Sequence, residues 1–198
     1  MSYVEILDLS NNMLSGIIPE CMGNFSSLHV LDLRKNRFYG SILGTFAERN
    51  HYRILNLNDN GLEGPVPRSL LNCSKLEVLD LGNNKINDTF PYWLGNLLEL
   101  RVLVLHSNKF YGSIWDCSKT NKCFPKLRIF DLSNNSFIDF LSARYFKNLE
   151  AMMDVGADER KLKYMGENYC HNFVMVTLKG FNSLSSNVTF ISILLSQE

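Results

Sequence analysis

The sequence of 198 residues carries 20 basic and 20 acidic side chains, so its formal net charge is zero, and 45% of its residues are hydrophobic. This composition predicts a folded domain rather than a disordered tail, and it gives no general attraction to nucleic acid or to an anionic membrane. The only late apolar run, residues 188–195, is much shorter than the roughly 20 residues that span a bilayer, so no transmembrane segment is expected.

Six asparagines recur along the chain, with four intervals of 24 residues and a last one of 27. Each stands in the same frame, L-x-x-L-x-L-x-x-N-x-L-x-G-x-I-P. A fixed period of this length indicates a solenoid, in which each repeat is one supersecondary unit that cannot bury its apolar face alone. The ladder asparagines are Asn12, Asn36, Asn60, Asn84, Asn108 and Asn135.

The alternating leucines before each ladder asparagine predict a short strand. In the fourth repeat Leu79 and Leu81 point inward and Asp80 points outward, because successive side chains of a strand alternate between its faces. Stacked repeats then form a parallel sheet with strands about 4.8 Å apart. Each asparagine amide can bond to backbone groups where the chain leaves this sheet, so we interpret the ladder as structural rather than as a set of ligand contacts.

Two further columns, two and six residues after each asparagine, are apolar in every repeat and are expected in the core. They are Leu14, Phe38, Leu62, Ile86, Phe110 and Phe137, and Ile18, Ile42, Val66, Phe90, Ile114 and Leu141. A glycine stands four residues after the asparagine in four repeats, where it permits unusual backbone angles, and Asp88 and Asp139 replace it in the other two. The Ile-Pro or Val-Pro pairs that follow predict a second short strand at an edge.

The cysteines differ in their place within the repeat. Cys73 shares a column with Phe25 and Leu97, so it is expected to be a small buried hydrophobic residue. Cys117 and Cys123 bracket the stretched 27-residue interval, where a local disulfide in an oxidising compartment and a pair of unbonded thiols are both open interpretations. No close pairs with metal-ligand spacing accompany them, so neither a metal nor another cofactor is expected.

Five N-x-S/T tripeptides mark possible sites of N-glycosylation. Asn24 and Asn72 share one repeat register, which predicts that both are exposed or neither is. A glycan on Asn134 would obstruct partners, because this residue precedes a ladder asparagine on the predicted concave side. The four glycosylation candidates are Asn24, Asn72, Asn87 and Asn134, and the fifth tripeptide, at Asn187, lies in the aperiodic end of the chain.

The residues 30–40, 64–70 and 75–91, with their L-x-G-x-I-P endings, resemble plant extracellular leucine-rich-repeat proteins. Within that family the chain is similar to a C-terminal ectodomain fragment of a receptor-like protein, the kinase-less type of disease resistance and development. The resemblance implies an α/β leucine-rich-repeat solenoid, a horseshoe with a concave parallel sheet, second short strands, and 3-10 or short helices on its convex side. It divides the chain into about six repeats in 1–150, an island-like segment in 151–180 and an aberrant, disordered or truncated tail in 181–198.

The resemblance also implies a non-catalytic recognition module on the extracellular side of the plasma membrane. It would bind a peptide or protein ligand or a receptor-kinase co-receptor in defence or developmental signalling. Neither a secretion signal nor a polar cap precedes Val4, so we interpret the chain as the middle of a longer array. The alternatives are a wall-associated inhibitor of pathogen enzymes and a truncated, non-signalling product.

The outward strand positions form columns on the predicted concave face. One column is rich in aspartate, but its carboxylates follow the repeat rather than a cleft, so no enzyme activity is expected. Two other columns vary between repeats and can contact an extended partner. From them we predict the contact residues Arg34, Arg53, Asn58, Arg101 and His106, the alternative for each being an unengaged solvated side chain. Tyr39 and Tyr111 are further exposed candidates on the next strand.

Overall fold

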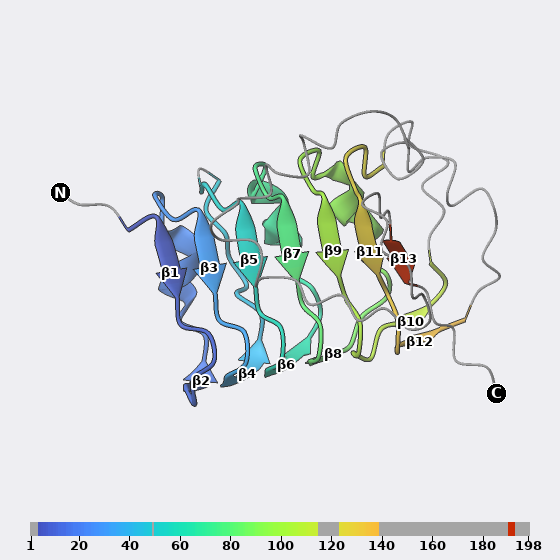
Figure 1. Ribbon diagram of the computed structural model, residues 1–198, viewed down its shortest axis with the longest axis horizontal. Coiled ribbons are helices and arrows are strands. Elements are labelled where there is room, and N and C mark those ends of the chain that lie inside the picture. Colours follow the sequence, from blue (N-terminus) through green and yellow to red (C-terminus); the bar gives the residue numbers. More distant parts are fainter. Residues whose placement is uncertain (1–3, 49, 115–122, 139–189, 193–198) are drawn as a thin grey trace, which may run out of the picture.

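The computed structural model describes residues 4–48, 50–114, 123–138 and 190–192 (Figure 1). Within these ranges one parallel sheet, here the main sheet, runs the length of the molecule in the order β1-β3-β5-β7-β9-β11-β13. Its strands are β1 (Ile6–Asp8), β3 (Val30–Asp32), β5 (Ile54–Asn56), β7 (Val78–Asp80), β9 (Val102–Val104), β11 (Ile129–Asp131) and β13 (Phe190–Ser192).

The register of the main sheet follows the sequence period. Leu55 pairs with Leu79 and Leu79 with Leu103, so each residue lies beside its equivalent in the next repeat. The stretched interval keeps this register, because Leu103 pairs with Phe130. The three extra residues of that interval are therefore accommodated outside the strands.

A second row of short strands lies along one edge of the main sheet (Figure 1). A four-stranded parallel sheet contains β2 (Ser15–Ile17), β4 (Arg37–Ser41), β6 (Gly61–Gly64) and β8 (Lys85–Ile86), and a separate pair contains β10 (Tyr111–Gly112) and β12 (Ser136–Phe137). Among the described residues the helices are all of 3-10 type: η1 (Glu20–Asn24), η2 (Arg68–Asn72) and η3 (Tyr92–Asn96). Each follows a proline, which fixes φ just before the helix.

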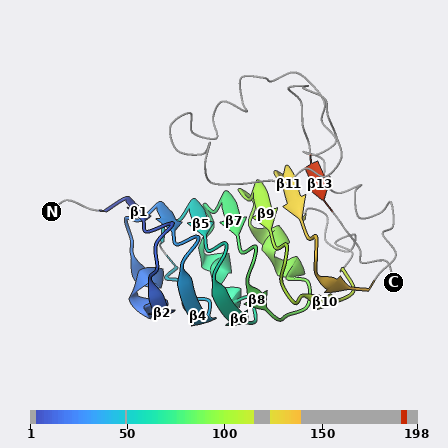
Figure 2. The same cartoon turned by 60° about the horizontal axis from the view of Figure 1, so that its bottom comes forward.

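The helices cover one face of the main sheet, and the core lies between these layers (Figure 2). Leu31, Leu55, Leu79 and Leu103 are completely buried there, and burial of each leucine stabilises the fold by about 1.5–3 kcal/mol. These strands, turns and helices confirm the predicted leucine-rich-repeat solenoid.

The predicted core columns are buried at the described positions, Ile18 of the first repeat included, but two other residues of the first repeat differ. Leu14 is 40% exposed and Phe25 is also exposed, so the prediction that they are core residues is wrong. Both lie in the repeat that contains β1 and β2, which stand at the edges of their sheets. An edge repeat has a packing neighbour on only one side, so its apolar residues stay partly in solvent.

The ladder asparagines link consecutive repeats. Asn84 Nδ2 lies 3.0–3.1 Å from the carbonyl oxygens of Leu57, Leu81 and Gly82, and its Oδ1 accepts the Leu62 N–H at 3.0 Å. The same set of four contacts recurs at Asn36, Asn60, Asn108 and Asn135. Asn12, in the edge repeat, donates only to Leu9 and Ser10 within its own turn.

The C-terminal part of the chain departs from one prediction. Residues 190–192 form β13, which pairs in parallel with β11, so the expectation of a disordered or truncated tail is wrong for these three residues. Their sequence, Phe-Ile-Ser, includes the aromatic and β-branched types that favour strands. The island-like segment 151–180, Leu141, Asp139 and Asn187 lie outside the described residues, and the domain boundaries stay a prediction.

Candidate binding surface on the main sheet

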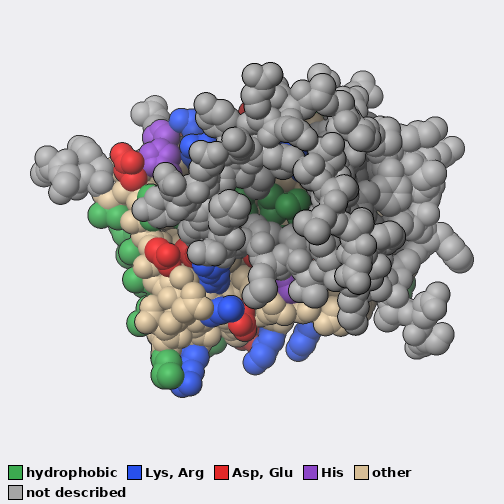
Figure 3. Space-filling model, in the orientation of Figure 1, with side chains coloured by type: hydrophobic (Ala, Val, Ile, Leu, Met, Phe, Trp, Pro, Cys, Tyr) green, Lys and Arg blue, Asp and Glu red, His purple; other side chains and the backbone are tan. Residues whose placement is uncertain are grey.

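The outer face of the main sheet is the face opposite the leucine core, and it carries the predicted contact residues. Four columns of equivalent positions cross it, one residue from each repeat. They are Glu5, His29, Arg53, Glu77, Arg101 and Arg128; Ile6, Val30, Ile54, Val78, Val102 and Ile129; Asp8, Asp32, Asn56, Asp80, Val104 and Asp131; and Ser10, Arg34, Asn58, Gly82, His106 and Ser133. In Figure 3 acidic, basic and histidine side chains all occur on the side of the molecule that Figure 1 shows.

The second of these columns, which runs from Ile6 to Ile129 and contains only valine and isoleucine, is a feature that the sequence analysis did not predict. Val78, Val102 and Val104 form a buried cluster separate from the main core, and Ile54 and Ile129 pack against it. The signal was present in the sequence, because a valine or isoleucine precedes the first strand leucine, or Phe130 in its place, in every repeat. These β-branched residues suit a strand and stabilise its outer side.

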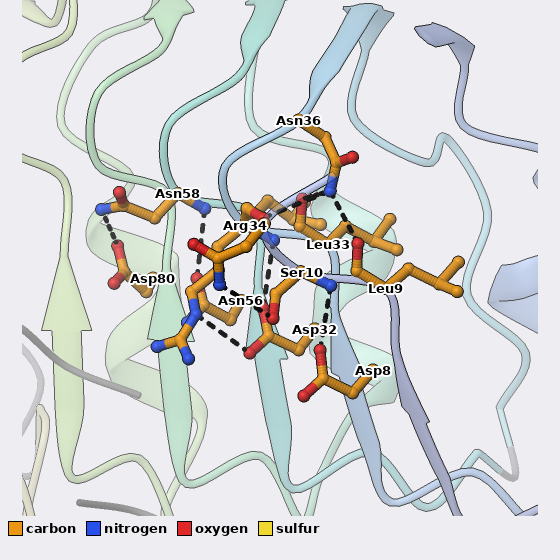
Figure 4. Close-up of polar contacts among 12 residues, drawn as sticks. Asp8, Leu9, Ser10, Asp32, Leu33, Arg34, Asn36, Asn56, Asn58 and Asp80 are labelled. Carbon is orange, nitrogen blue, oxygen red and sulfur yellow. Dashed lines mark hydrogen bonds and ion pairs between the residues drawn. The ribbon is translucent and has the colours of Figure 1, made fainter. Parts of the chain in front are cut away.

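The side chains of the aspartate column point away from the leucine core as predicted. Those after the first repeat are nevertheless buried instead of solvated. Asp80 Oδ1 accepts hydrogen bonds from Asn58 Nδ2 and from the Gly82 N–H, both at 3.0 Å. Asp32 Oδ1 accepts the Arg34 N–H at 3.0 Å (Figure 4). Hydrogen bonds from its own turn and from the neighbouring repeat therefore replace water around the Asp80 carboxylate, whereas the Arg34 N–H in its own turn does so at Asp32 Oδ1.

Burial governs the ionisation of two of these carboxyl groups. It raises the pKa of Asp32 to about 6, although the Arg34 N–H and guanidinium act in the opposite direction. Burial also raises the pKa of Asp80, although the hydrogen bond from Asn58 acts to lower it.

The pocket of about 380 Å³ between Val4 and Leu28 lies elsewhere, at the edge repeat, and no acidic side chain lines it. The geometry gives Asp32 and Asp80 a structural role within the sheet.

The charged column contains a chain of ion pairs centred on Glu77. Arg53 places Nη2 at 2.6 Å and Nε at 2.7 Å from Glu77 Oε1, and Arg101 Nε lies 3.8 Å from Glu77 Oε2. The two predicted arginines come from different repeats and share one carboxylate. Glu77 was missed as a site residue, although a single acid between two arginines in one column could have indicated it.

Asn58 and His106 come together over Gly82. A Cβ atom on Gly82 would lie 2.6 Å from both Asn58 Nδ2 and His106 Nε2, so a larger residue there would displace these two side chains. His106 Nδ1 also lies 3.2 Å from Ser107 Oγ. The fifth predicted residue, Arg34, places Nε 3.3 Å from Asp32 Oδ2. Each of the five side chains therefore has a partner on the sheet or its turns, and their role as contact residues for a ligand stays a prediction.

The two tyrosines lie on a different side of the molecule. Tyr39 belongs to β4 and Tyr111 to β10, in the row of second strands, and each is at least half exposed. They are not brought together with the five predicted contact residues of the outer face.

The glycosylation candidates differ in exposure. Asn24, Asn87 and Asn134 are exposed, whereas Asn72 is half-buried and donates from Nδ2 to the Phe46 carbonyl at 2.7 Å. The prediction that Asn24 and Asn72 have equal exposure is therefore wrong, because Asn72 bonds to the Phe46 carbonyl and no equivalent bond forms at Asn24 among the described residues.

Cys73 is completely buried, and burial raises the pKa of its thiol to about 12. Cys123 is buried against Gly95. Its predicted partner Cys117 lies outside the described residues, so the disulfide stays a prediction.

Comparison with known proteins identifies the family. The Leucine rich repeat family is matched at residues 50–110, and a second leucine-rich-repeat family at residues 3–25. Receptor-like protein 32 of Arabidopsis thaliana is 46% identical over 179 residues, which cover 88% of this chain and 20% of that protein. The chain belongs to the leucine-rich-repeat family. Within that family it is similar to plant receptor-like proteins, and it spans about a fifth of the length of Receptor-like protein 32.

Solved leucine-rich-repeat structures show the same fold. The crystal structure of PEPR1-AtPEP1 superposes with a TM-score of 0.68 at 30% identity, over 75% of this chain and 20% of that one. The Arabidopsis receptor kinase HAESA, in complex with the peptide hormone IDA and the co-receptor SERK1, gives a TM-score of 0.55 at 30% identity, over 68% of this chain and 22% of that one.

Two further features of this leucine-rich-repeat chain concern membranes and metals. Across the residues that the structure describes, no helix has the length and apolar character needed to cross a membrane. Within the same ranges, no three histidine, cysteine, aspartate or glutamate side chains gather in a way that could hold a metal ion.

Proposed function

We propose that the outer face of the main sheet binds a peptide or protein ligand or a receptor-kinase co-receptor. In this proposal the chain acts as a recognition module at the extracellular side of the plasma membrane, in plant defence or developmental signalling. It performs no catalysis, and the five predicted residues together with Glu77 make the contacts.

The observation that carries the proposal is the set of ion pairs across repeats. Arg53 and Arg101 have side chains that are 55% and 32% exposed, and Glu77 holds both. A partner that meets them loses little side-chain entropy, because the carboxylate already orders the guanidinium groups. Arginine also forms directed, paired hydrogen bonds with carboxylates and carbonyls, which suits it to an interface.

The buried valines beside this column have a different part in the proposal. Val78 and Val102 are inaccessible, so they stiffen the strands that present the arginines rather than meet a partner. The relatives support a recognition role, because the solved HAESA structure contains a peptide hormone and a co-receptor. Their ligands are properties of those proteins, and the ligand class is carried to this chain as a proposal.

The test uses peptides selected from a displayed random library on the purified chain, with the SERK1 ectodomain as a second probe. The double variant Arg53→Gln/Arg101→Gln is expected to weaken binding about tenfold to hundredfold, since a charge-assisted hydrogen bond contributes about 1.5–3 kcal/mol. The matched control is Lys126→Gln, which removes the exposed ion pair between Lys126 Nζ and Glu99 Oε2, 2.7 Å apart. Both residues lie outside the four columns of the outer face.

Unchanged affinity in the double variant would exclude these arginines as contacts. Equal losses in the double variant and in Lys126→Gln would indicate a general charge effect. Failure of both probes to bind the unaltered chain would count against the proposed function itself.

A further inference from the structure

Asn87 lies immediately after β8, in the interior of the array, with described repeats on both sides. Its side chain is exposed and makes no hydrogen bond within the described part of the structure, while its backbone N–H donates to the Gly64 carbonyl at 3.1 Å. It begins the tripeptide Asn87-Asp88-Thr89, which matches the acceptor sequence for N-linked glycans. The residues equivalent to Asn87 include Tyr39, Glu63 and Tyr111, which are exposed as well, so the exposure of Asn87 follows from its place in the repeat.

Asp88 follows Asn87 at a position that holds glycine in four other repeats. The equivalent residues Gly40, Gly64 and Gly112 have φ between 76° and 79°, a region that aspartate does not adopt here. The Asp88 carboxylate instead accepts the Val66 N–H at 3.0 Å through Oδ2 and the Thr89 N–H at 2.8 Å through Oδ1.

The departure at Asp88 coincides with a break in the row of second strands. β8 ends at Ile86, and the row continues as a separate sheet from β10, with one isolated bridge from Thr89 to Tyr111. Asn87 therefore stands at an interruption, with its backbone tied to one neighbouring repeat and its side chain open to solvent.

Two of the other acceptor asparagines, Asn72 and Asn134, have side chains that are already engaged. Asn72 is half-buried, and its Nδ2 is engaged with the Phe46 carbonyl. Asn134 Nδ2 donates to Ser107 Oγ at 3.0 Å, and its φ of 54° holds it in the left-handed turn beside the outer face. Asn24 is exposed on η1 in the edge repeat, and among the described residues its side chain makes no hydrogen bond.

We propose that Asn87 is a site of N-glycosylation whose glycan covers the row of second strands and leaves the outer face open. Its Nδ2 forms a bond to the anomeric carbon of an oligosaccharide carried on a lipid diphosphate. The bond from that carbon to the diphosphate oxygen breaks, the diphosphate leaves with the electron pair, and Nδ2 loses one proton to a base of the transferring enzyme.

The test directs the chain into the secretory pathway of plant cells behind a secretion leader. Purified protein is treated with peptide N-glycosidase in water enriched in oxygen-18, and each acceptor position is mapped by mass spectrometry. The expected result is oxygen-18 aspartate at position 87, with Asn72 and Asn134 unmodified. An unmodified Asn87, or a labelled position 72 or 134, would overturn the proposal.

Two substitutions at Thr89 separate glycan loss from a structural change. Thr89→Ala removes the acceptor sequence while keeping Asn87, so it should abolish labelling at position 87, and Thr89→Ser should retain it. Labelling that persists in Thr89→Ala would also overturn the proposal. Peptide binding is measured separately, so failure of the proposed function leaves this result interpretable.

Discussion

Asp32 and Arg34 form an ion pair within one turn, with Oδ2 of Asp32 3.3 Å from Nε of Arg34, yet the aspartate is completely buried. Within the described structure, that oxygen accepts no hydrogen bond. Burial therefore outweighs the arginine, and the pKa of Asp32 rises from 3.8 to about 6. The folded chain favours the protonated carboxyl more than the unfolded chain does.

The sign of the resulting pH dependence follows from this raised pKa. The stability that Asp32 contributes is fully present below its unfolded pKa of 3.8 and is lost as the pH rises through about 6. The free energy of unfolding of Asp32→Asn, measured against that of the unaltered chain, should therefore be higher at about pH 7 than at about pH 4. The difference between the two pH values should be at most about 3 kcal/mol. The neighbouring repeat already carries an asparagine in this column, Asn56, which accepts the Asn58 N–H.

Urea unfolding of both proteins at the two pH values measures this effect. Asp8→Asn is the matched control, because Asp8 also accepts the N–H two residues later but is exposed. A stability difference between the unaltered chain and Asp32→Asn that is the same at both pH values would contradict the role assigned to burial.

The ladder contacts predict that substitution by alanine lowers the free energy of unfolding much more at Asn84 than at Asn12. Asn84→Ala removes four hydrogen-bonding contacts and leaves the Leu62 N–H without its acceptor, while the Leu57, Leu81 and Gly82 carbonyls each keep one other donor. It should lower the free energy of unfolding by about 2–4 kcal/mol. Asn12→Ala removes two bonds at an exposed edge and should cost about 1 kcal/mol or less. Thermal and urea unfolding would compare them, and equal losses would argue against the inter-repeat bonds.

A close backbone approach makes Gly23 irreplaceable. A Cβ atom added there would overlap the carbonyl oxygen of Thr45, which belongs to the rigid backbone of the next repeat. Gly23→Ala should therefore destabilise the fold by about 3 kcal/mol or more. Gly44→Ala is the control, since Gly44 has open space around its Cβ position and should be neutral within about 1 kcal/mol. A Gly23→Ala protein as stable as Gly44→Ala would disprove this contact.

The buried thiol of Cys73 should be unreactive in the folded chain. Its pKa of about 12 and its burial keep it protonated and inaccessible, whereas Cys21 is exposed on η1. Iodoacetamide should label Cys21 within minutes, and Cys73 only after unfolding in guanidinium chloride. Peptide mapping by mass spectrometry distinguishes the two sites, and rapid labelling of Cys73 without denaturant would contradict its place in the core.

The repeat period is enough to predict several features of the fold. Because Leu79, Leu81 and Asn84 recur at a fixed spacing, their roles in strand, core and turn can be assigned by counting. The same counting predicts the register of the strands, since each residue pairs with its equivalent one period away. These features depend on local geometry that repeats along the chain.

Repeat positions gave wrong predictions of burial where neighbouring side chains in space decide whether a residue is covered. Leu14 and Phe25 follow the repeat but lie in an edge repeat, so they are exposed where their later described equivalents are covered. Asp32 and Asp80 alternate outward as the strand pattern requires, yet hydrogen bonds and side chains around them exclude water.

The sequence alone therefore determined the path of the backbone, because a fixed period of apolar residues and asparagines admits one way of stacking the repeats. Only the tertiary structure decided that Arg53 and Arg101 share Glu77 and that Asn58 and His106 meet over Gly82. Those relationships join side chains of different repeats, whose identities vary independently, so the period that fixes the backbone carries no information about them.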